Sequence, residues 1–207
     1  MTIENCQFIN NNAQNGGALY LDGYMYHVIK HDDPTWESYK DKYHYDEYYH
    51  QEIQYGWYEW MPSNPYDYGK YYYEDYSSDL YIRENFKYTI NNCQFSDNNA
   101  TTSGGSIYYK TDSYSDYNAL NISNSVFSNN VAKSGGAIYS YYGVIKNCNF
   151  NNNRVTVDGG AIYTDASARI QYCNFTENIA GKCGGAVYGW FRTLERSKFT
   201  KNNAENG

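Results

Sequence analysis

The stretch IKNCNFNNNRVTVDGGAIY, residues 145–163, is one copy of a pattern that recurs along the chain. The pattern is easiest to follow by its phenylalanine, which occurs at Phe8, Phe95, Phe127, Phe150, Phe175 and Phe199. An asparagine stands three residues after each of them, at Asn11, Asn98, Asn130, Asn153, Asn178 and Asn202. A large aliphatic residue precedes each phenylalanine by five positions, and a cysteine or serine precedes it by two. Columns that keep phase over six copies indicate a structural repeat, because a low-complexity tract does not hold apolar positions in register.

A glycine pair follows in each of the first five copies. The pairs are Gly16-Gly17, Gly104-Gly105, Gly135-Gly136, Gly159-Gly160 and Gly184-Gly185. A small residue, an aliphatic residue and a tyrosine come next, as in GGAIY. Successive phenylalanines are 87, 32, 23, 25 and 24 residues apart, so a unit of about 24 residues carries one large insertion and one small one. Such a unit is too short for tetratricopeptide or ankyrin repeats, and the leucine pattern of leucine-rich repeats is absent.

These features predict an all-β fold, a right-handed single-stranded parallel β-helix of about five to six coils. Each unit holds two short runs suited to β-strands, and neither run can bury its apolar face alone. In stacked coils equivalent residues lie about 4.8 Å apart. The phenylalanines then form an inward ladder, and the asparagines form a turn ladder whose amides bond along the axis. We expect these asparagines and the glycine pairs to adopt the left-handed backbone conformation that a sharp corner needs.

The pairing of FxxN with GGA[ILV] resembles the repeat of the chlamydial polymorphic outer membrane proteins and of the adhesin-like surface proteins of methanogenic archaea. The resemblance covers residues 1–21 and 89–207. It implies a secreted or surface-exposed β-helical passenger that serves in adhesion. Proteins of that kind are long and carry a signal peptide and an anchor, neither of which is visible in this sequence. We therefore expect the chain to be part of a longer protein at the cell surface or outside the cell.

Composition excludes several classes of protein. The formal net charge is -7 and charged residues make up 19%, so the chain lacks the basic face that a nucleic-acid binder needs. No run approaches 18 consecutive apolar residues, so no membrane-spanning helix is expected. The start, MTIENCQFIN, has neither the basic residues nor the apolar run of a signal peptide.

A single β-helix domain over residues 1–207 is predicted, with an insertion at residues 22–88 and a shorter loop insertion at residues 110–119. The large insertion holds 17 of the 28 tyrosines and three of the four tryptophans, with 14 acids against 6 bases. Both insertions leave the coils just after a GGALY-type segment, at the same edge. Insertions on one face of a solenoid often form its binding surface.

The candidate ligand-binding residues are the tryptophans and a tyrosine run of the large insertion: Trp36, Trp57, Trp60, Tyr71, Tyr72 and Tyr73. Tyrosine and tryptophan suit recognition surfaces because they offer large contact areas at a low entropy cost, and they also stack on sugar rings. Two other interpretations stay open: a poorly ordered loop kept soluble by its acids, or a cap over the end of the coils. A helix over roughly residues 34–54 is possible, since Asp33-Pro34 suits a helix start, and residues 63–79 are predicted as loop.

No catalytic residue, cofactor site or metal site is predicted. Many parallel β-helices cleave polysaccharides, which requires two carboxylates about 5 to 9.5 Å apart. Asp22 and Asp165 share a column but belong to the first and fourth coils, roughly 14 Å apart. His27 and His31 are four residues apart in a segment that is not clearly helical, so a metal site there is the weaker interpretation.

The cysteines do not settle the cellular compartment. Cys6, Cys93, Cys148 and Cys173 fall in the small inward column, where a free thiol behaves as a compact apolar group. Cys148 and Cys173 are the two in directly successive coils of regular length, and two buried thiols are favoured over a disulfide. Cys183 precedes a glycine pair and is expected at a turn.

The sequence thus favours a non-catalytic, adhesin-like surface protein that binds a protein or glycan ligand through loops on a rigid solenoid. A carbohydrate-active β-helix enzyme, a lyase or hydrolase with its site in the insertion, is the first alternative. A purely structural stalk fragment is the second.

Overall fold

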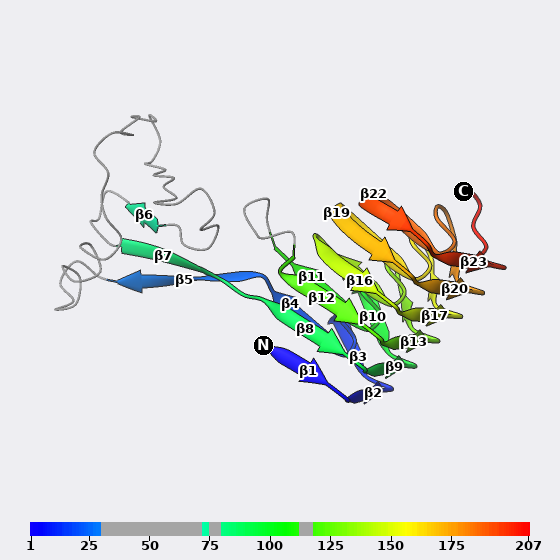
Figure 1. Ribbon diagram of the computed structural model, residues 1–207, viewed down its shortest axis with the longest axis horizontal. Coiled ribbons are helices and arrows are strands. Elements are labelled where there is room, and N and C mark those ends of the chain that lie inside the picture. The colour runs from blue at the N-terminus through cyan, green and yellow to red at the C-terminus, as the bar shows by residue number, and fades with distance from the viewer. Residues whose placement is uncertain (30–71, 75–79, 112–117) are drawn as a thin grey trace. The chain divides into compact units, whose positions relative to one another are not determined.

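The computed structural model describes residues 1–29, 72–74, 80–111 and 118–207. These residues fall into two compact units. The first, the coils, holds residues 1–23, 87–111 and 118–207, and the second holds the described residues between 24 and 86. All regular elements of the described residues are strands (Figure 1).

Successive coils contribute strands to three parallel sheets. The first sheet takes the strands before the phenylalanine, β1 (Thr2–Glu4), β8 (Tyr88–Asn91), β12 (Leu120–Ser123) and β16 (Gly143–Lys146), and those after the glycine pair, β4 (Leu19–Asp22), β11 (Ile107–Lys110) and β15 (Ile138–Ser140). In the last coils these two runs join in the long strands β19 (Ile162–Gln171) and β22 (Val187–Glu195).

The second sheet carries the phenylalanines, and the third follows the ladder asparagines. The second consists of β2 (Gln7–Ile9), β9 (Gln94–Ser96), β13 (Val126–Ser128), β17 (Asn149–Asn151), β20 (Asn174–Thr176) and β23 (Lys198–Thr200). The third consists of β3 (Asn12–Asn15), β10 (Asn99–Ser103), β14 (Val131–Ala132), β18 (Arg154–Val155) and β21 (Ile179–Ala180). Phe127 pairs in parallel register with Phe95 on one side and Phe150 on the other. This pairing confirms the predicted all-β parallel solenoid.

The third sheet is a feature that the sequence analysis missed, since it expected two β-runs in each unit. Its inward residues are short: Ala100, Ala132, Val155 and Ala180 form one buried cluster. A single small apolar residue between asparagines and threonines resembles a turn in sequence. It can line a sheet here because the neighbouring coils supply the rest of the apolar surface.

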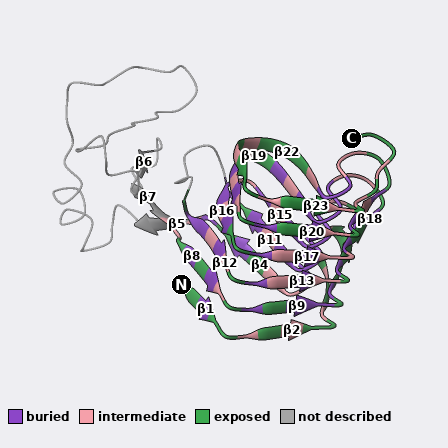
Figure 2. Ribbon diagram, turned by 45° about the vertical axis from the view of Figure 1, so that its right-hand side comes forward, coloured by how far each residue is buried: buried purple, intermediate pink, exposed green. Residues whose placement is uncertain are grey.

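The core consists of ladders of like residues between the three sheets (Figure 2). The rings of Phe127 and Phe150 stack with their centroids 4.9 Å apart and their planes 7° apart. The aliphatic column before them is equally buried, with Ile90 and Ile145 fully inaccessible to solvent. The ladders follow from the repeat, because in-register coils place each residue on its own equivalent.

The left-handed residues lie one position before the expected ones. The ladder asparagines do not adopt positive φ; the residues just before them do, with φ between 53° and 58°: Asn10, Asp97, Asn129, Asn152, Glu177 and Lys201. A second turn, before the small column, has the same conformation at Asn5, Asn92, Asn124, Asn147, Tyr172 and Arg196. The prediction of left-handed ladder asparagines is therefore wrong, because these residues turn inward and the preceding residue makes the corner.

The two glycines of each pair serve different purposes. The first, for example Gly135, has φ of +63°, as predicted. The second is not left-handed. A Cβ on Gly136 would lie 2.1 Å from the carbonyl oxygen of Gly160 in the next coil. The second glycine is thus required by the close approach of successive coils.

The second unit contains a three-stranded antiparallel sheet in the order β5-β7-β6. Its strands are β5 (Tyr24–Ile29), β6 (Tyr72–Glu74) and β7 (Leu80–Asn85). The prediction of loop over residues 63–79 is wrong at β6, where pairing with β7 overrides the weak local pattern. The possible helix over 34–54 lies outside the described residues.

Candidate functional site

The predicted ligand-binding residues fall mostly outside the described part of the chain. These outside residues are Trp36, Trp57, Trp60 and Tyr71. Tyr72 and Tyr73 belong to β6, where their backbones pair with Ile82 and Tyr81 of β7. His27 lies on β5, which is a strand, and His31 lies outside the described residues.

The insertion leaves the coils after Asp22 and Gly23 and returns to them at Tyr88, and these residues are called the neck. The hydroxyl of Tyr88 donates a hydrogen bond of 2.7 Å to the backbone oxygen of Asp22, so the last residue of β4 and the first residue of β8 are tied together. The backbone of Gly23 donates to the oxygen of Lys110, also at 2.7 Å. From this point β5 and β7 run as an antiparallel pair that begins with Tyr24 opposite Asn85. The chain therefore leaves and re-enters the coils at adjacent positions.

The ladder asparagines are buried structural residues. The side-chain amide of Asn130 donates to the backbone oxygen of Phe95 at 3.1 Å and to Oδ1 of Asn153 at 2.9 Å. The backbone N–H of Asn130 donates to the same Oδ1 at 3.0 Å. Each asparagine therefore bonds to both neighbouring coils, to a phenylalanine carbonyl in the preceding one and to an asparagine in the following one. Asn98, Asn130, Asn153 and Asn178 are fully buried.

The tyrosines after the glycine pairs form a second, outward ladder: Tyr20, Tyr108, Tyr139, Tyr163 and Tyr188. Successive ring centroids are 5.1, 5.1, 4.8 and 5.4 Å apart. The end rings are the most open, with Tyr20 48% and Tyr188 38% exposed. The recurring GGxxY motif already indicated that these tyrosines stack on one another. Only the structure shows that their rings point outward, because side chains alternate between the two faces of a strand.

Asp165 lies against this tyrosine ladder. Its Oδ2 accepts a short hydrogen bond from the hydroxyl of Tyr139 in the preceding coil. Burial of the phenol raises the pKa of Tyr139, and the hydrogen bond with Asp165 and its negative charge raise it further. Burial also raises the pKa of Tyr163, followed by the charge of Asp165. The carboxylate is thereby oriented and these phenols remain neutral donors.

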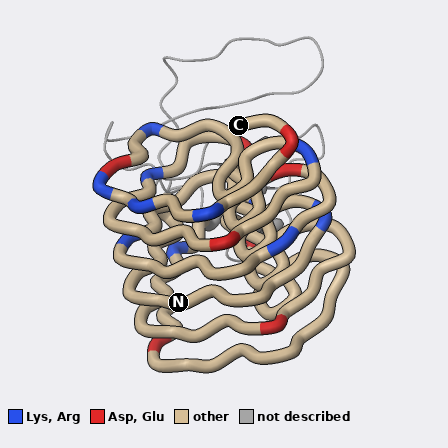
Figure 3. Tube along the Cα trace, turned by 90° about the vertical axis from the view of Figure 1, so that its right-hand side faces the viewer, with Lys and Arg blue, Asp and Glu red and all other residues tan. Residues whose placement is uncertain are grey.

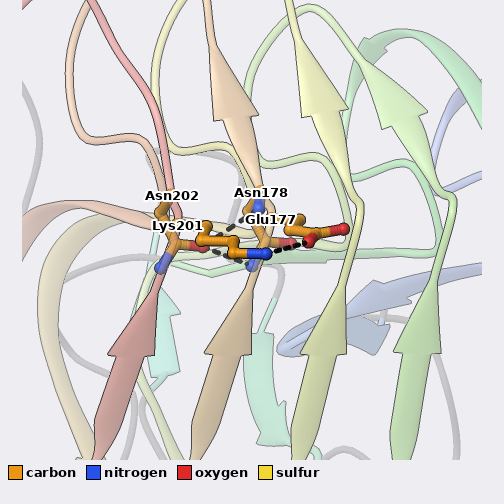
Figure 4. Close-up of polar contacts among 4 residues, drawn as sticks. All are labelled: Glu177, Asn178, Lys201 and Asn202. Carbon is orange, nitrogen blue, oxygen red and sulfur yellow. Dashed lines mark hydrogen bonds and ion pairs between the residues drawn. The ribbon is translucent and has the colours of Figure 1, made fainter.

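The last two coils replace the turn asparagines with long side chains. At one turn Arg196 donates to the hydroxyl of Tyr172 at 2.7 Å, and Lys146 lies 5.5 Å from the centroid of the same ring. At the other, Lys201 lies 3.5 Å from the carboxylate of Glu177 (Figure 4). Each pair spans adjacent coils, as the asparagine pairs do elsewhere. These contacts link adjacent coils at the turns, as the asparagine side chains do in the earlier coils.

Lysine and arginine positions are concentrated on the coils nearer the C-terminus (Figure 3). Residues 118–207 contain nine lysines and arginines against five acids, whereas residues 1–23 contain two acids and no base. The insertion, at -8 from its 14 acids and 6 bases, has the opposite sign. The coils therefore carry a charge gradient along their axis.

The two carboxylates that share a column, Asp22 and Asp165, do not lie in adjacent coils. Asp22 lies opposite Lys110 in the register of β4 and β11, and the coil of β15 separates Lys110 from the coil of Asp165. In the part of the chain that the structure describes, no group of three or more His, Cys, Asp or Glu is placed to hold a metal ion.

All five cysteines are free thiols. Cys148 and Cys173 are buried in successive coils, and a hydrogen bond between the two thiols, together with burial, raises the pKa of Cys148. Cys6 and Cys93 are also in successive coils, because the insertion loops out between them and leaves β2 paired with β9. The long insertion between Cys6 and Cys93 in the sequence hides the fact that the two residues are neighbours in the fold. Cys183 donates its backbone N–H to Asp158 at 3.0 Å, beside the last glycine pair.

Comparison with known families gives a match over four segments. Residues 92–110, 124–141, 147–165 and 172–189 match the Chlamydia polymorphic membrane protein repeat. The chain carries polymorphic membrane protein repeats. Each match runs from the turn before a phenylalanine to the outward tyrosine or just beyond it, so one polymorphic membrane protein repeat corresponds to one coil. The copies at Phe8 and Phe199 lie outside the matches but pair in the same register.

The family supports a location at the cell surface or outer membrane. Searches of curated proteins and of solved structures found no match. Among the described residues, no helix has the length and apolarity needed to cross a membrane.

Proposed function

We propose that the chain is a non-catalytic surface adhesin, in which stacked polymorphic membrane protein repeats form a rigid support and the acidic, tyrosine-rich insertion binds a protein or glycan ligand. The polymorphic membrane protein repeats carry the proposal, because they support a protein of adhesin type at the cell surface. The contact between Asp22 and Tyr88 adds to it, since the chain leaves the coils after Asp22 and returns at Tyr88, and the described residues between 24 and 86 belong to a compact unit of their own.

The geometry of the coils suits a support. The first five coils bond to one another through backbone pairs in three sheets, and the asparagine ladder links each coil to the next. Such a stack bends little, because a local opening breaks several ladders at once. The residues at which a loop leaves and re-enters the stack are therefore held in fixed positions. Rigid scaffolds with variable loops are a common arrangement for recognition.

Deletion of the insertion tests the proposal. Residues 24–86 would be replaced by two glycines, which the adjacent positions of β4 and β8 permit. Circular dichroism and thermal unfolding would check that the coils still fold. Beads coated with the purified protein would then be scored for attachment to host epithelial cells. We expect the deletion to abolish attachment while the coils stay folded.

The matched control keeps the insertion and removes its aromatic anchors. Replacing Trp36, Trp57 and Trp60 together with alanine preserves the chain length and the acids, so a loss of attachment would locate binding in the aromatic residues. Full attachment by a folded deletion variant would contradict the role of the insertion. Release of reducing or unsaturated sugars from host or plant glycans would contradict the non-catalytic part.

A further inference from the structure

One inward column of the coils groups its cysteines in twos. This is the small column two residues before each phenylalanine, and from the first coil to the sixth it reads Cys6, Cys93, Ser125, Cys148, Cys173 and Ser197. Two cysteines are followed by a serine, and the same order then repeats. Within these six coils, each cysteine of the column therefore has a cysteine in one adjacent coil only.

Backbone hydrogen bonds hold this column in register from coil to coil. The N–H of Gln94 donates to the oxygen of Cys6, and the N–H of Asn174 donates to the oxygen of Cys148, both at 2.9 Å. In-register strands lie about 4.8 Å apart. A disulfide spans Cα atoms that are about 4.4–6.8 Å apart. The two members of each pair can therefore be joined without a change of register.

The thiols of each pair contact one another inside the coils. The thiol of Cys148 is hydrogen-bonded to that of Cys173, and the thiol of Cys93 to that of Cys6. Cys93, Cys148 and Cys173 are buried. A buried cysteine can be joined only to a residue that the fold places against it, and here that residue is the second thiol of the pair.

The serines of the column keep the two pairs apart. The N–H of Cys93 donates to Oγ of Ser125, and the N–H of Cys173 donates to Oγ of Ser197, each at 3.1 Å. Each serine thus occupies the place at which a third thiol would compete. Cys183 lies outside this column, before the last glycine pair. The fold therefore selects one pairing of the cysteines.

We propose that both pairs are disulfide sites and that each pair is oxidised while the coils fold. The linked residues are Cys6 with Cys93 and Cys148 with Cys173. The family supports a location at the cell surface or outer membrane, and disulfides form and persist in such oxidising surroundings. The inference goes beyond the proposed function, because it does not depend on what the insertion binds.

Each disulfide forms in two exchange steps with a disulfide donor. The thiolate of one cysteine attacks the donor, which gives a mixed disulfide and releases one donor thiol. The thiolate of the second cysteine then attacks the sulfur of the first and releases the other donor thiol. Two electrons pass to the donor, which also receives the two thiol protons. Because the thiolate is the reactive form and burial disfavours it, the exchange precedes closure of the coils over the pair.

The first of these disulfides joins the two sides of the insertion. It closes a loop from residue 6 to residue 93, which contains all of residues 24–86. The second links the fourth coil to the fifth. A disulfide restrains the unfolded chain, and the restraint grows with the length of the loop. The link across the insertion therefore holds the first coil on the second, although 87 residues separate their phenylalanines.

The test uses the full chain, reduced and then refolded in a buffer of oxidised and reduced glutathione. Free thiols are alkylated, and the unreduced protein is cleaved at methionine with cyanogen bromide in denaturant. Cleavage after Met25 and Met61 separates the segment that contains Cys6 from the segment that contains the other four cysteines. We expect the two segments to remain joined on a non-reducing gel and to separate when a reductant is added.

Mass spectrometry of a tryptic digest tests the second link. Trypsin cleaves after Arg154 and Arg169, between Cys148 and Cys173, so these cysteines appear in one species only if they are linked. We expect that species before reduction, with Cys183 alkylated. The oxidised chain should also unfold at a higher urea concentration than the reduced chain.

Cysteine-to-serine variants are the matched controls, because serine occupies this column in the third and sixth coils. Cys173→Ser should remove the second link alone and leave Cys148 alkylated. Cys183→Ser should leave both links in place. Circular dichroism would confirm that the variants fold.

Three results would overturn the inference. The first is alkylation of all five cysteines after refolding in the oxidising buffer. The second is a set of links that join other cysteines in similar yield. The third is the same set of links, in the same proportions, when the chain is oxidised in urea, since the fold would then not direct the pairing. If attachment were still lost on deleting residues 24–86, any of these results would leave the proposed function intact.

Discussion

At the scale of single residues, the chain depends on buried polar side chains that are fully bonded. Asn153 accepts two hydrogen bonds from Asn130 through Oδ1 and donates two through its amide, to Phe127 and Asn178. Every donor and acceptor of this side chain is thus used, which is what makes a buried amide tolerable. Asn152, at the exposed turn beside it, has a positive φ and donates to Oδ1 of Asn129 in the preceding coil at 2.8 Å.

Asn153→Ala should destabilise the protein by about 2–5 kcal/mol. The substitution leaves the Phe127 oxygen and the Asn130 N–H buried without their partner, and each such group costs about 1–3 kcal/mol. Urea unfolding followed by circular dichroism would measure the change. Asn149→Ala is the matched control, because it removes only an exposed bond from Asn174; it should change stability by no more than about 0.5 kcal/mol. Equal effects of the two variants would contradict the ladder's role.

Stability should fall at alkaline pH because of the outward tyrosines. The pKa values of Tyr108, Tyr139 and Tyr163 are raised in the folded chain, chiefly by burial. A group with a raised folded pKa contributes its full stability below the unfolded pKa, about 10 for tyrosine, and loses it as the pH rises through the folded pKa. Unfolding free energies between pH 8 and about pH 11.5 should therefore decline above pH 10.

Tyr139→Phe should make this decline shallower, because the phenol that donates to Asp165 is gone. Asp165→Asn should act in the same direction, since it removes the negative charge that raises the pKa of Tyr139. A decline as steep as that of the wild type in both variants would show that other groups govern the alkaline limit.

At the scale of the element, one coil is held to the next by short strands that are too weak to stand alone. The third sheet has strands of two residues, such as β14 and β18, and an inner surface of alanine and valine. What allows so thin a sheet is the close approach of the backbones at the glycine pair, where Gly105 donates to Gly135 at 3.1 Å and Gly136 donates to Gly159 at 3.2 Å.

Gly136→Ala should destabilise the protein by about 3 kcal/mol, the upper part of the usual range for overpacking. The new Cβ would meet the Gly160 oxygen at 2.1 Å and the Arg154 nitrogen at 3.0 Å, and both are backbone atoms that cannot turn away. Hydrogen exchange should show the loss concentrated between the third and fourth coils. Lys133→Ala, an exposed residue close by, should change stability by no more than about 0.5 kcal/mol, and a Gly136→Ala variant as stable as this control would refute the argument.

At the scale of the whole molecule, the coils behave as a one-dimensional stack in which each unit is stabilised by its neighbours. Phenylalanine, asparagine and tyrosine ladders run through this stack in parallel, two inside and one outside. The insertion changes none of them, since β1 pairs with β8 and β2 with β9 as if the intervening residues were absent. This independence lets the polymorphic membrane protein repeats carry variable loops.

The sequence by itself determined the repeat, the parallel solenoid, the inward phenylalanines and the axial asparagines, because in-register stacking turns every repeated column into a ladder. Only the tertiary structure decided which corner residue is left-handed, that alanines line a third sheet, and that Cys6 lies beside Cys93. These three features depend on contacts between coils, which the spacing of residues along the sequence does not specify. The structural effect of a residue that departs from the repeat therefore depends on the residues that lie beside it in the neighbouring coils.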